Sequence, residues 1–236
     1  MTPDALLALT EATWPPASRQ TVGTWIIRDG QGGGQRVSAA TPLVGWTTAD
    51  IPQAEAAMQT LNQPLLFLIR PGDEVLDDAL AQRGYHIADP VVAYCAPTNL
   101  LAETDPPFLT TFPHWPPLGI ARQLWAEAGT GPARLAVMDR VRGPKTVILG
   151  RTGDRAAGVA FVACHGADAM LHALEVAPAL RRQGTAHNIL RAAAQWAQGH
   201  DATRLFLLVT AANETARRLY ASLGMQLVGQ YHYRKK

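Results

Sequence analysis

The sequence predicts a mixed α/β fold built from two related halves. The 236 residues are 47% hydrophobic and 17% charged, a globular composition long enough for one large domain or two small ones. Apolar segments with strand-like and helix-like spacing follow one another along the second half. A segment of the first half also recurs in the second half at a constant offset, which relates the two halves to each other.

The recurring segment reads LLFLIRPGDEVLDDALAQRGYHI at 65–87 and LFLLVTAANETARRLYASLGMQL at 205–227, an offset of 140 residues (205 minus 65) without a gap. Each copy reads as a buried strand, a polar turn, a helix, and a glycine, Gly84 or Gly224, that ends the helix before another strand. Any strand–helix–strand unit shares part of this pattern, but the gap-free register and the shared glycine favour an internal duplication at domain scale.

Two stretches rich in proline or glycine divide the chain further. Prolines crowd residues 97–117, PTNLLAETDPPFLTTFPHWPP, which indicates a linker followed by an irregular segment. We therefore place a boundary near residues 98–107, with one domain over 1–98 and a second over 108–236. The glycine run DGQGGGQRV at 29–37 lies between two strand-like segments, so it predicts a hairpin turn rather than a phosphate loop, which would lead into a helix.

The elements of the second half follow in a clear order. Helices are predicted over 118–129 and 132–141, and strands over 145–152, 156–166 and 169–178. After the turn RRQGTA comes a helix whose apolar side chains recur at spacings of three and four, before it ends at Gly199: Ala186, Ile189, Leu190, Ala193, Ala194 and Ala197. A strand over 204–210, a helix over 213–224 and a strand over 225–234 complete a mixed α/β order.

The turn RRQGTA, residues 181–186, has the features of an anion site. The first N–H groups of a helix have no internal partner, and the helix dipole adds partial positive charge there. Gly184 and Ala186 let a ligand approach the backbone closely, and Arg181 and Arg182 add cationic donors. The turn could hold a pyrophosphate or a similar anion. Taken alone, the hexapeptide favours an ordinary solvated turn between a strand and a helix, because such short patterns are common.

Composition and charge argue against several classes of protein. A formal net charge of +2, from 21 basic and 19 acidic residues, gives no footprint for nucleic acid. The apolar runs are too short for a membrane span, and the N-terminus lacks the basic start of a signal peptide. Cys95 and Cys164 have no metal-ligand spacing, so we expect no metal site, and two free thiols fit a cytoplasmic protein. The sequence leaves open a monomer or a homodimer.

Two motifs in order resemble the GCN5-related N-acetyltransferase (GNAT) superfamily. Its pattern [QR]-x-x-G-x-[GA] falls on 181–186, and N-x-x-A-x-x-x-Y-x-x-x-G-[FM] falls on 213–225; the resemblance covers about 118–236. It implies acetyl-CoA as cosubstrate and two domains that each hold a mixed sheet flanked by helices. It also implies that the pyrophosphate lies on the helix start, at Arg181, Arg182, Gln183, Gly184, Thr185, Ala186 and His187.

The resemblance also suggests catalytic roles, each with a structural alternative. The strand before the turn would pair its backbone, at Leu174, Glu175 and Val176, with the pantetheine arm, and a backbone N–H near Val176 would polarise the thioester carbonyl. Tyr220 would protonate the leaving thiolate, or it is a buried core aromatic. Asn213 would contact the cofactor, or it only caps its helix.

The base that deprotonates the amine is left open between two residues. LHAL-x-V at 171–176 resembles the strand of arylalkylamine N-acetyltransferases that carries a histidine on a proton relay, here His172, although their second histidine is Met170 here. Glu175 is the other candidate. The two have opposite parity, so a flat strand cannot aim both at one site. His172 is equally read as a packed, hydrogen-bonded strand residue, and Glu175 as a solvent-side or salt-bridged one.

The sequence therefore predicts an N-acetyltransferase that acts on a primary amine of a small molecule or peptide. At the 140-residue offset the first half carries TPLVGW (41–46) where the second has RRQGTA, and Leu80 where the second has Tyr220. We accordingly expect a degenerate first copy, which together with TFPHWPP would shape the acceptor pocket. The alternative is a non-catalytic acyl-CoA-binding or regulatory module.

Overall fold

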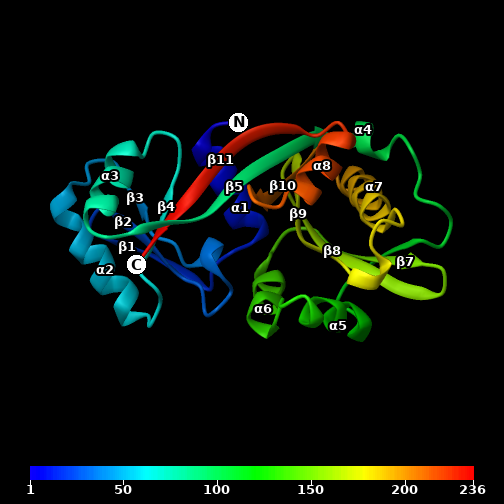
Figure 1. The fold of residues 1–236 in the computed structure, drawn as a ribbon, viewed down its shortest axis with the longest axis horizontal. Coiled ribbons are helices and arrows are strands. Elements are labelled where there is room, and N and C mark those ends of the chain that lie inside the picture. The colour runs from blue at the N-terminus through cyan, green and yellow to red at the C-terminus, as the bar shows by residue number, and fades with distance from the viewer.

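The computed structural model describes residues 1–236, and it confirms the mixed α/β fold (Figure 1). Its strands form one sheet of three strands and one of eight. The elements of the first half are α1 (Pro3–Thr13), β1 (Ser18–Val22), β2 (Trp25–Asp29), β3 (Thr41–Pro42), α2 (Ile51–Thr60), β4 (Leu66–Ile69), α3 (Glu74–Gln82), β5 (His86–Pro97) and α4 (Thr98–Ala102). Those of the second half are β6 (Thr111–His114), α5 (Gly119–Glu127), α6 (Pro132–Arg140), β7 (Lys145–Thr152), β8 (Arg155–His165), β9 (Asp168–Val176), α7 (Thr185–Gln198), β10 (Arg204–Thr210), α8 (Glu214–Ser222) and β11 (Gln226–Lys235).

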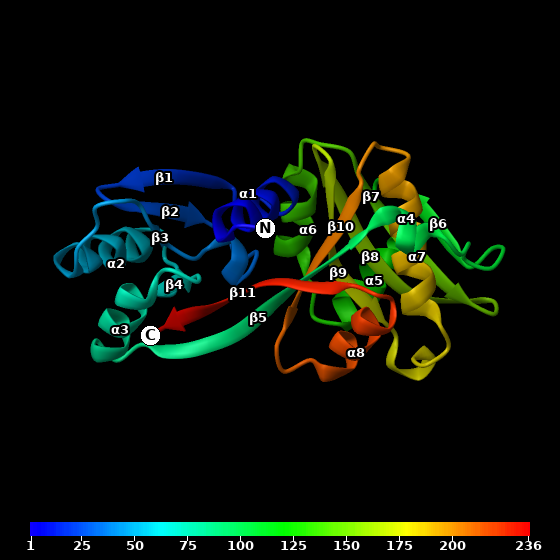
Figure 2. The ribbon, with the colours of Figure 1, turned by 90° about the horizontal axis from the view of Figure 1, so that it is seen from above.

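The large sheet contains strands from both halves of the chain, in the order β4-β11-β5-β10-β9-β8-β7-β6. Strand β5 lies between β10 and β11, and β11 lies between β5 and β4. The long strands β5 and β11 therefore run side by side across the middle of the molecule (Figures 1 and 2). Each half thus contributes its last strand to the strands of the other half.

The registers of the exchanged strands follow the offset seen in the sequence. Strand β11 pairs with β4 so that Lys235 faces Leu66, and β10 pairs with β5 so that Phe206 faces Cys95. These two pairs are equivalent under the 140-residue offset: position 66 plus 140 is Phe206, and position 235 minus 140 is Cys95. The domain boundary near 98–107 stays a prediction; these residues form α4 and the loop after it.

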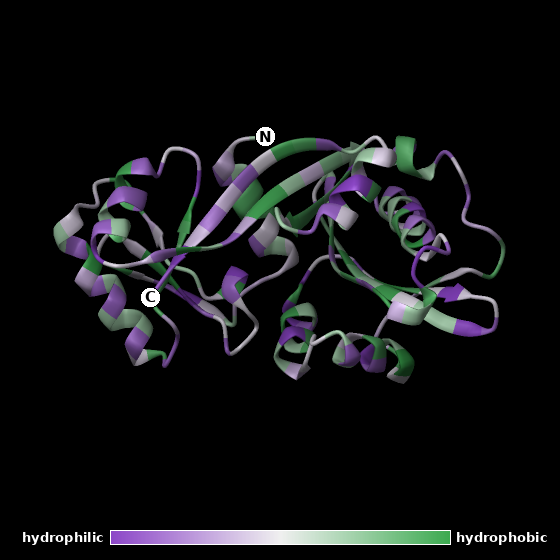
Figure 3. Cartoon of the chain, in the orientation of Figure 1, coloured by the Kyte–Doolittle hydropathy of each residue, from purple (hydrophilic) through white to green (hydrophobic).

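Helices cover both faces of the large sheet, as the alternation of buried side chains along β8 requires. Ala160 and Val162 belong to a core that includes the apolar face of α7, whereas Val159 and Phe161 belong to a core with α5 and α6. Hydrophobic residues accordingly mark the strands of this sheet, and α7 carries them on part of its surface (Figure 3). No helix has the length and apolar character that crossing a bilayer demands.

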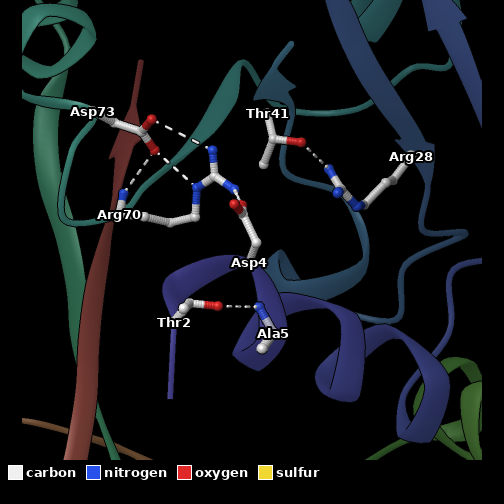
Figure 4. A network of polar contacts seen from close by, with 7 residues as sticks. All are labelled: Thr2, Asp4, Ala5, Arg28, Thr41, Arg70 and Asp73. Carbon is white, nitrogen blue, oxygen red and sulfur yellow. Dashed lines mark hydrogen bonds and ion pairs between the residues drawn. The ribbon is translucent and has the colours of Figure 1, made fainter. Parts of the chain in front are cut away.

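Helix α1 joins the two halves (Figure 2). Its Leu6 and Leu9 pack in one cluster with Ala93 of β5, Met170 of β9 and Phe206 of β10. On its other side, Glu11 forms an ion pair with the buried Arg28 of β2. The start of α1 is also held by an ion pair. Asp4 accepts a hydrogen bond at 2.6 Å from Arg70, the residue that follows β4 (Figure 4).

The glycine run at 29–37 forms a long connection between β2 and β3, which pair antiparallel as a hairpin does. The expectation of a strand straight after the glycines is wrong for 35–37, which form a short 3-10 helix. Positive φ angles at Gly32 (76°) and Gly34 (101°) turn the chain inward there, and Val37 is fully buried. Arg36, which precedes Val37 in this loop, therefore lies toward the second half of the molecule, where it contacts His172.

Candidate active site

Strands β9 and β10 separate at their carboxyl ends, and this opening is the centre of the site. They pair in parallel from Asp168 and Arg204 only as far as Leu171 and Leu207. Strand β9 nevertheless continues to Val176 and β10 to Thr210. The edge of β9 that faces β10 therefore has unpaired backbone groups beyond Leu171, while its other edge still pairs with β8. An extended ligand can add to such an edge through backbone hydrogen bonds.

A β-bulge lies in β9 where the two strands separate. His172 faces Phe161, yet Glu175 faces Val159, so three steps along β9 match two along β8. The extra residue is accommodated at Ala173, whose φ is 50°. The predicted opposite parity of His172 and Glu175 is therefore wrong, because it assumed a flat strand. Both side chains leave the same face of the sheet, together with Phe161 and Val159.

His172 is buried, and both of its ring nitrogens have partners. Nδ1 lies 3.1 Å from an Arg36 nitrogen, and Nε2 lies 3.0 Å from the Thr13 hydroxyl. A guanidinium can only donate, so Nδ1 accepts and the ring proton sits on Nε2. Burial, with a smaller contribution from the Arg36 charge, lowers the pKa of His172 well below its ordinary value. This environment favours the packed, hydrogen-bonded alternative, and a catalytic role for His172 stays a prediction.

Glu175 lies half-buried past the bulge, with its carboxylate free of side-chain hydrogen bonds. Burial raises the pKa of Glu175, and the nearby charges of Arg181 and Arg134 oppose that shift. A carboxylate with a raised pKa is a better proton acceptor than an ordinary one. This environment favours Glu175 as the general base, and its catalytic role stays a prediction. The sequence contains no pattern that places Arg134 of α6 near Glu175, so sequence analysis missed this charge.

Tyr220 of α8 is buried, with 6% of its surface exposed, and its ring packs at 5.7 Å from the ring of Tyr94 on β5. Burial raises the pKa of Tyr220, and the charge of Glu175 raises it further. The phenol therefore keeps its proton at neutral pH, and it lies near enough to Glu175 to be affected by its charge. Asn213 caps α8, since its side chain accepts from the Ala216 N–H at 3.1 Å.

The turn before α7 presents a row of free backbone donors. The N–H groups of residues 182–187 donate to no other group of the chain, and α7 has no side-chain cap. Gly184 is left-handed, with φ 85°, and nothing lies within 4 Å of where a Cβ would stand. Arg181 lies back against β9, where its Nε donates to the Val176 carbonyl at 3.1 Å. The turn thus combines open space, free donors and positive charge, which suits an anion.

Close packing fixes α7, and so its first turn, against the sheet. A Cβ at Gly150 would come within 2.7 Å of Ile189, and one at Gly158 within 3.1 Å of the same side chain. Thr185, at the start of α7, is buried and its hydroxyl lies 2.7 Å from that of Thr152 on β7. Its side chain therefore anchors the helix, which leaves its backbone N–H for a ligand.

The remaining predicted cofactor residues surround the same turn. Arg182 and Gln183 are exposed, whereas Ala186 and His187 are partly buried in the first turn of α7. Leu174 packs against the core beneath α7, and Val176 ends β9. The fold therefore brings the end of β9 and the start of α7 together. Fold and site together define a class of proteins in which two splayed parallel strands lie beside a helix start with free backbone N–H groups.

Comparison with known proteins identifies that class. Residues 111–225 match the acetyltransferase (GNAT) family. Over 97% of this chain and 96% of the relative, the sequence is 26% identical to the uncharacterized N-acetyltransferase YobR of Bacillus subtilis (strain 168). Residues 111–225 therefore belong to the GNAT superfamily, as the two motifs predicted.

Solved structures share the fold along most of the chain. A GCN5-related N-acetyltransferase from Kribbella flavida gives a TM-score of 0.73 at 15% identity, over 98% of this chain and 94% of that one. A tandem GNAT protein from the clavulanic acid biosynthesis pathway gives 0.62 at 16% identity, over 90% and 77%. The mixed α/β architecture is therefore that of GNAT proteins.

Proposed function

We propose that the protein transfers the acetyl group of acetyl-CoA to a primary amine. The observation that carries the proposal is the meeting of two unpaired backbone surfaces, the N–H groups of 182–187 and the free edge of β9 beyond Leu171. The first suits a pyrophosphate, and the second suits the amide-containing pantetheine arm. A donor held on both would extend along β9 toward the opening beside the bulge.

The transfer needs a group that takes a proton from the ammonium and a group that gives one to the thiolate, and the site offers a residue for each. Glu175 takes a proton from the ammonium, so that the amine nitrogen can attack the thioester carbon. The carbon–sulfur bond then breaks, Tyr220 supplies a proton to the leaving thiolate, and the second proton that the nitrogen loses as the amide forms returns Tyr220 to its neutral form through solvent. A backbone N–H near Val176 is the proposed donor to the carbonyl oxygen, which gains negative charge during the attack. In this assignment Glu175 is the base, because the nitrogens of His172 are already engaged.

A non-catalytic acyl-CoA-binding module is the second candidate. It is favoured by the same engagement of His172, which leaves one carboxylate as the only proposed base. An amine panel with acetyl-CoA separates the two functions. Thiol release that depends on an amine, with the acetylated amine identified by mass spectrometry, is the result we expect. Binding of acetyl-CoA by calorimetry without thiol release above hydrolysis for any amine would establish the module instead.

A further inference from the structure

A small cavity lies beside α1, where the helix meets the exchanged strands β4 and β11. Its volume is about 30 Å³, which has room for about two water molecules or one carboxylate group. Two arginines, a glutamine and two tyrosines line it, and no acidic side chain does. The lining comes from α1, the glycine-rich loop, β4 with the residue after it, and β11: Pro3, Leu6, Leu7, Thr10, Arg36, Leu68, Arg70, Gln230, Tyr231 and Tyr233.

Arg36 brings an unbalanced positive charge to this cavity. One of its terminal nitrogens donates to His172, which is neutral, and it forms no ion pair with any carboxylate. Its Nε is buried and has no hydrogen-bond partner. Buried charges are normally paired, and a buried N–H without an acceptor is costly. The Nε of Arg36 therefore lacks an acceptor, and an anion in the cavity would supply one and balance the charge of the guanidinium.

A second unpaired group lines the same cavity. The Tyr231 hydroxyl is buried and has no hydrogen-bond partner. Only four buried side-chain polar atoms of the protein lack one, and two of the four belong to Arg36 and Tyr231. The ring of Tyr231 meets that of Tyr233 edge-on, with centroids 5.5 Å apart. A guanidinium N–H and a phenol O–H are the donors that a carboxylate accepts from.

Arg70, the other arginine of the cavity, does not need a ligand. Its Nε donates to Asp73 at 2.9 Å and a terminal nitrogen donates to Asp4 at 2.6 Å (Figure 4). These two carboxylates more than balance the charge of Arg70, and the contact with Asp4 fixes the start of α1 over the cavity. The positive charge that remains for a ligand is therefore that of Arg36.

We propose that this cavity binds a carboxylate group of the acceptor, so that the substrate is a molecule carrying both a primary amine and a carboxylate. This proposal rests on the proposed acetyl transfer. Arg36 links the cavity to the site, since it contacts His172, which shares a face of β9 with Glu175. An acceptor with its carboxylate on Arg36 and Tyr231 would be held beside the strand that carries the proposed base.

The test compares amino acids with their carboxamides: glycine with glycinamide, β-alanine with β-alaninamide, and lysine with lysinamide. Thiol release with acetyl-CoA should favour the acids in kcat/KM by roughly 10–100-fold, the range of one or two charge-assisted hydrogen bonds. Tyr231→Phe and Arg36→Gln should reduce that preference toward one. Tyr85→Phe is the matched control, because its hydroxyl bonds Glu55 in the first half, away from the cavity, and should keep the preference.

Ligand-observed NMR of the same pairs on the CoA-loaded protein provides a readout without turnover. Acids that bind in a Tyr231-dependent way support the carboxylate site, even if no amine is acetylated, and then it is the acetyl transfer that fails. Equal acetylation of acids and amides would leave the transferase in place and overturn the carboxylate site. A preference for acids that Tyr231→Phe and Arg36→Gln leave unchanged would also overturn it, and the cavity would hold water only.

Discussion

The two halves of the molecule pair their strands in the same register, but they differ where a donor would bind. Helix α7 begins with free N–H groups and no side-chain cap. The corresponding helix of the first half, α2, follows a capping box in which Asp50 accepts from the Thr47 N–H at 2.7 Å. The first half thus places its own carboxylate at the helix start, where the second half has Arg181 and Arg182. Similar strand pairing therefore does not imply a similar site.

The same contrast holds along α3 and α8. Asn213 caps α8, whereas Asp73, at the matching position, binds Arg70 instead. Tyr220 brings a hydroxyl to the second half, whereas the matching Leu80 is fully buried and apolar. Both side chains fill a core, so packing requires only a large side chain at this position. The hydroxyl of Tyr220 is what packing does not explain.

The largest effect on kcat should come from removing the hydroxyl of Tyr220, which the matching Leu80 lacks. Tyr220→Phe removes the hydroxyl and keeps the ring, so we expect kcat to fall by ~10²–10⁴-fold, the usual contribution of general acid catalysis. Affinity for acetyl-CoA should hardly change. The matched control is Tyr94→Phe, which makes the same change in the ring packed against Tyr220. A kcat within about threefold of the parent for Tyr220→Phe would return Tyr220 to a core role.

The next largest effect should come from the turn at 181–186, compared with the matching residues 41–46 of the first half. Gly184→Asp places a carboxylate where the phosphates are proposed to lie, and we expect affinity for CoA to fall at least about 100-fold, because like charges repel by several kcal/mol at short range. Gly184→Asn has the same shape without the charge and also tolerates a left-handed backbone. Val44→Asp makes the same change at the matching position of the first half. Calorimetry that finds equal losses for all three variants would contradict a phosphate site at Gly184.

Stoichiometry tests the same contrast in the unmodified protein. Since the 3-10 turn that leads into α2 has an acidic capping box of its own, we expect one CoA per chain, bound in the second half. Calorimetric titration of the full chain gives that number directly. A second equivalent that survives in Gly184→Asp would mean that the first half binds a donor of its own.

The sequence predicted what local patterns determine, and missed what distant residues determine. The turn, α7 and the cap at Asn213 follow from short motifs, and each lies where it was predicted. The bulge at Ala173 was missed because a positive φ at alanine has no residue signature. The bond between Arg36 and His172 joins residues 136 positions apart, and no pattern within either segment indicates it. The placement of β5 between β10 and β11 is equally a matter of distant pairing.

The smallest expected effect concerns His172. This residue of the second half contacts Arg36 of the first half. The pKa of His172 is lowered on folding, so the unfolded chain takes up a proton at a higher pH than the folded protein does. The free energy of unfolding should therefore fall as the pH drops below the ordinary histidine value of about 6.5, by up to about 1.4 kcal/mol per pH unit until the folded group titrates. Denaturant unfolding at several pH values measures this slope.

His172→Gln separates packing from proton transfer. A glutamine amide can accept from Arg36 through its oxygen and donate to Thr13 through its nitrogen, but it does not titrate. We expect the variant to fold and to lose the part of the pH slope that belongs to this residue, while all other histidines contribute equally to both proteins. If Glu175 is the base, kcat should change little. A fall of ~10² or more in kcat, with stability at neutral pH unchanged, would make His172 the base after all, and would turn its contact with Arg36 from packing into part of the catalytic path.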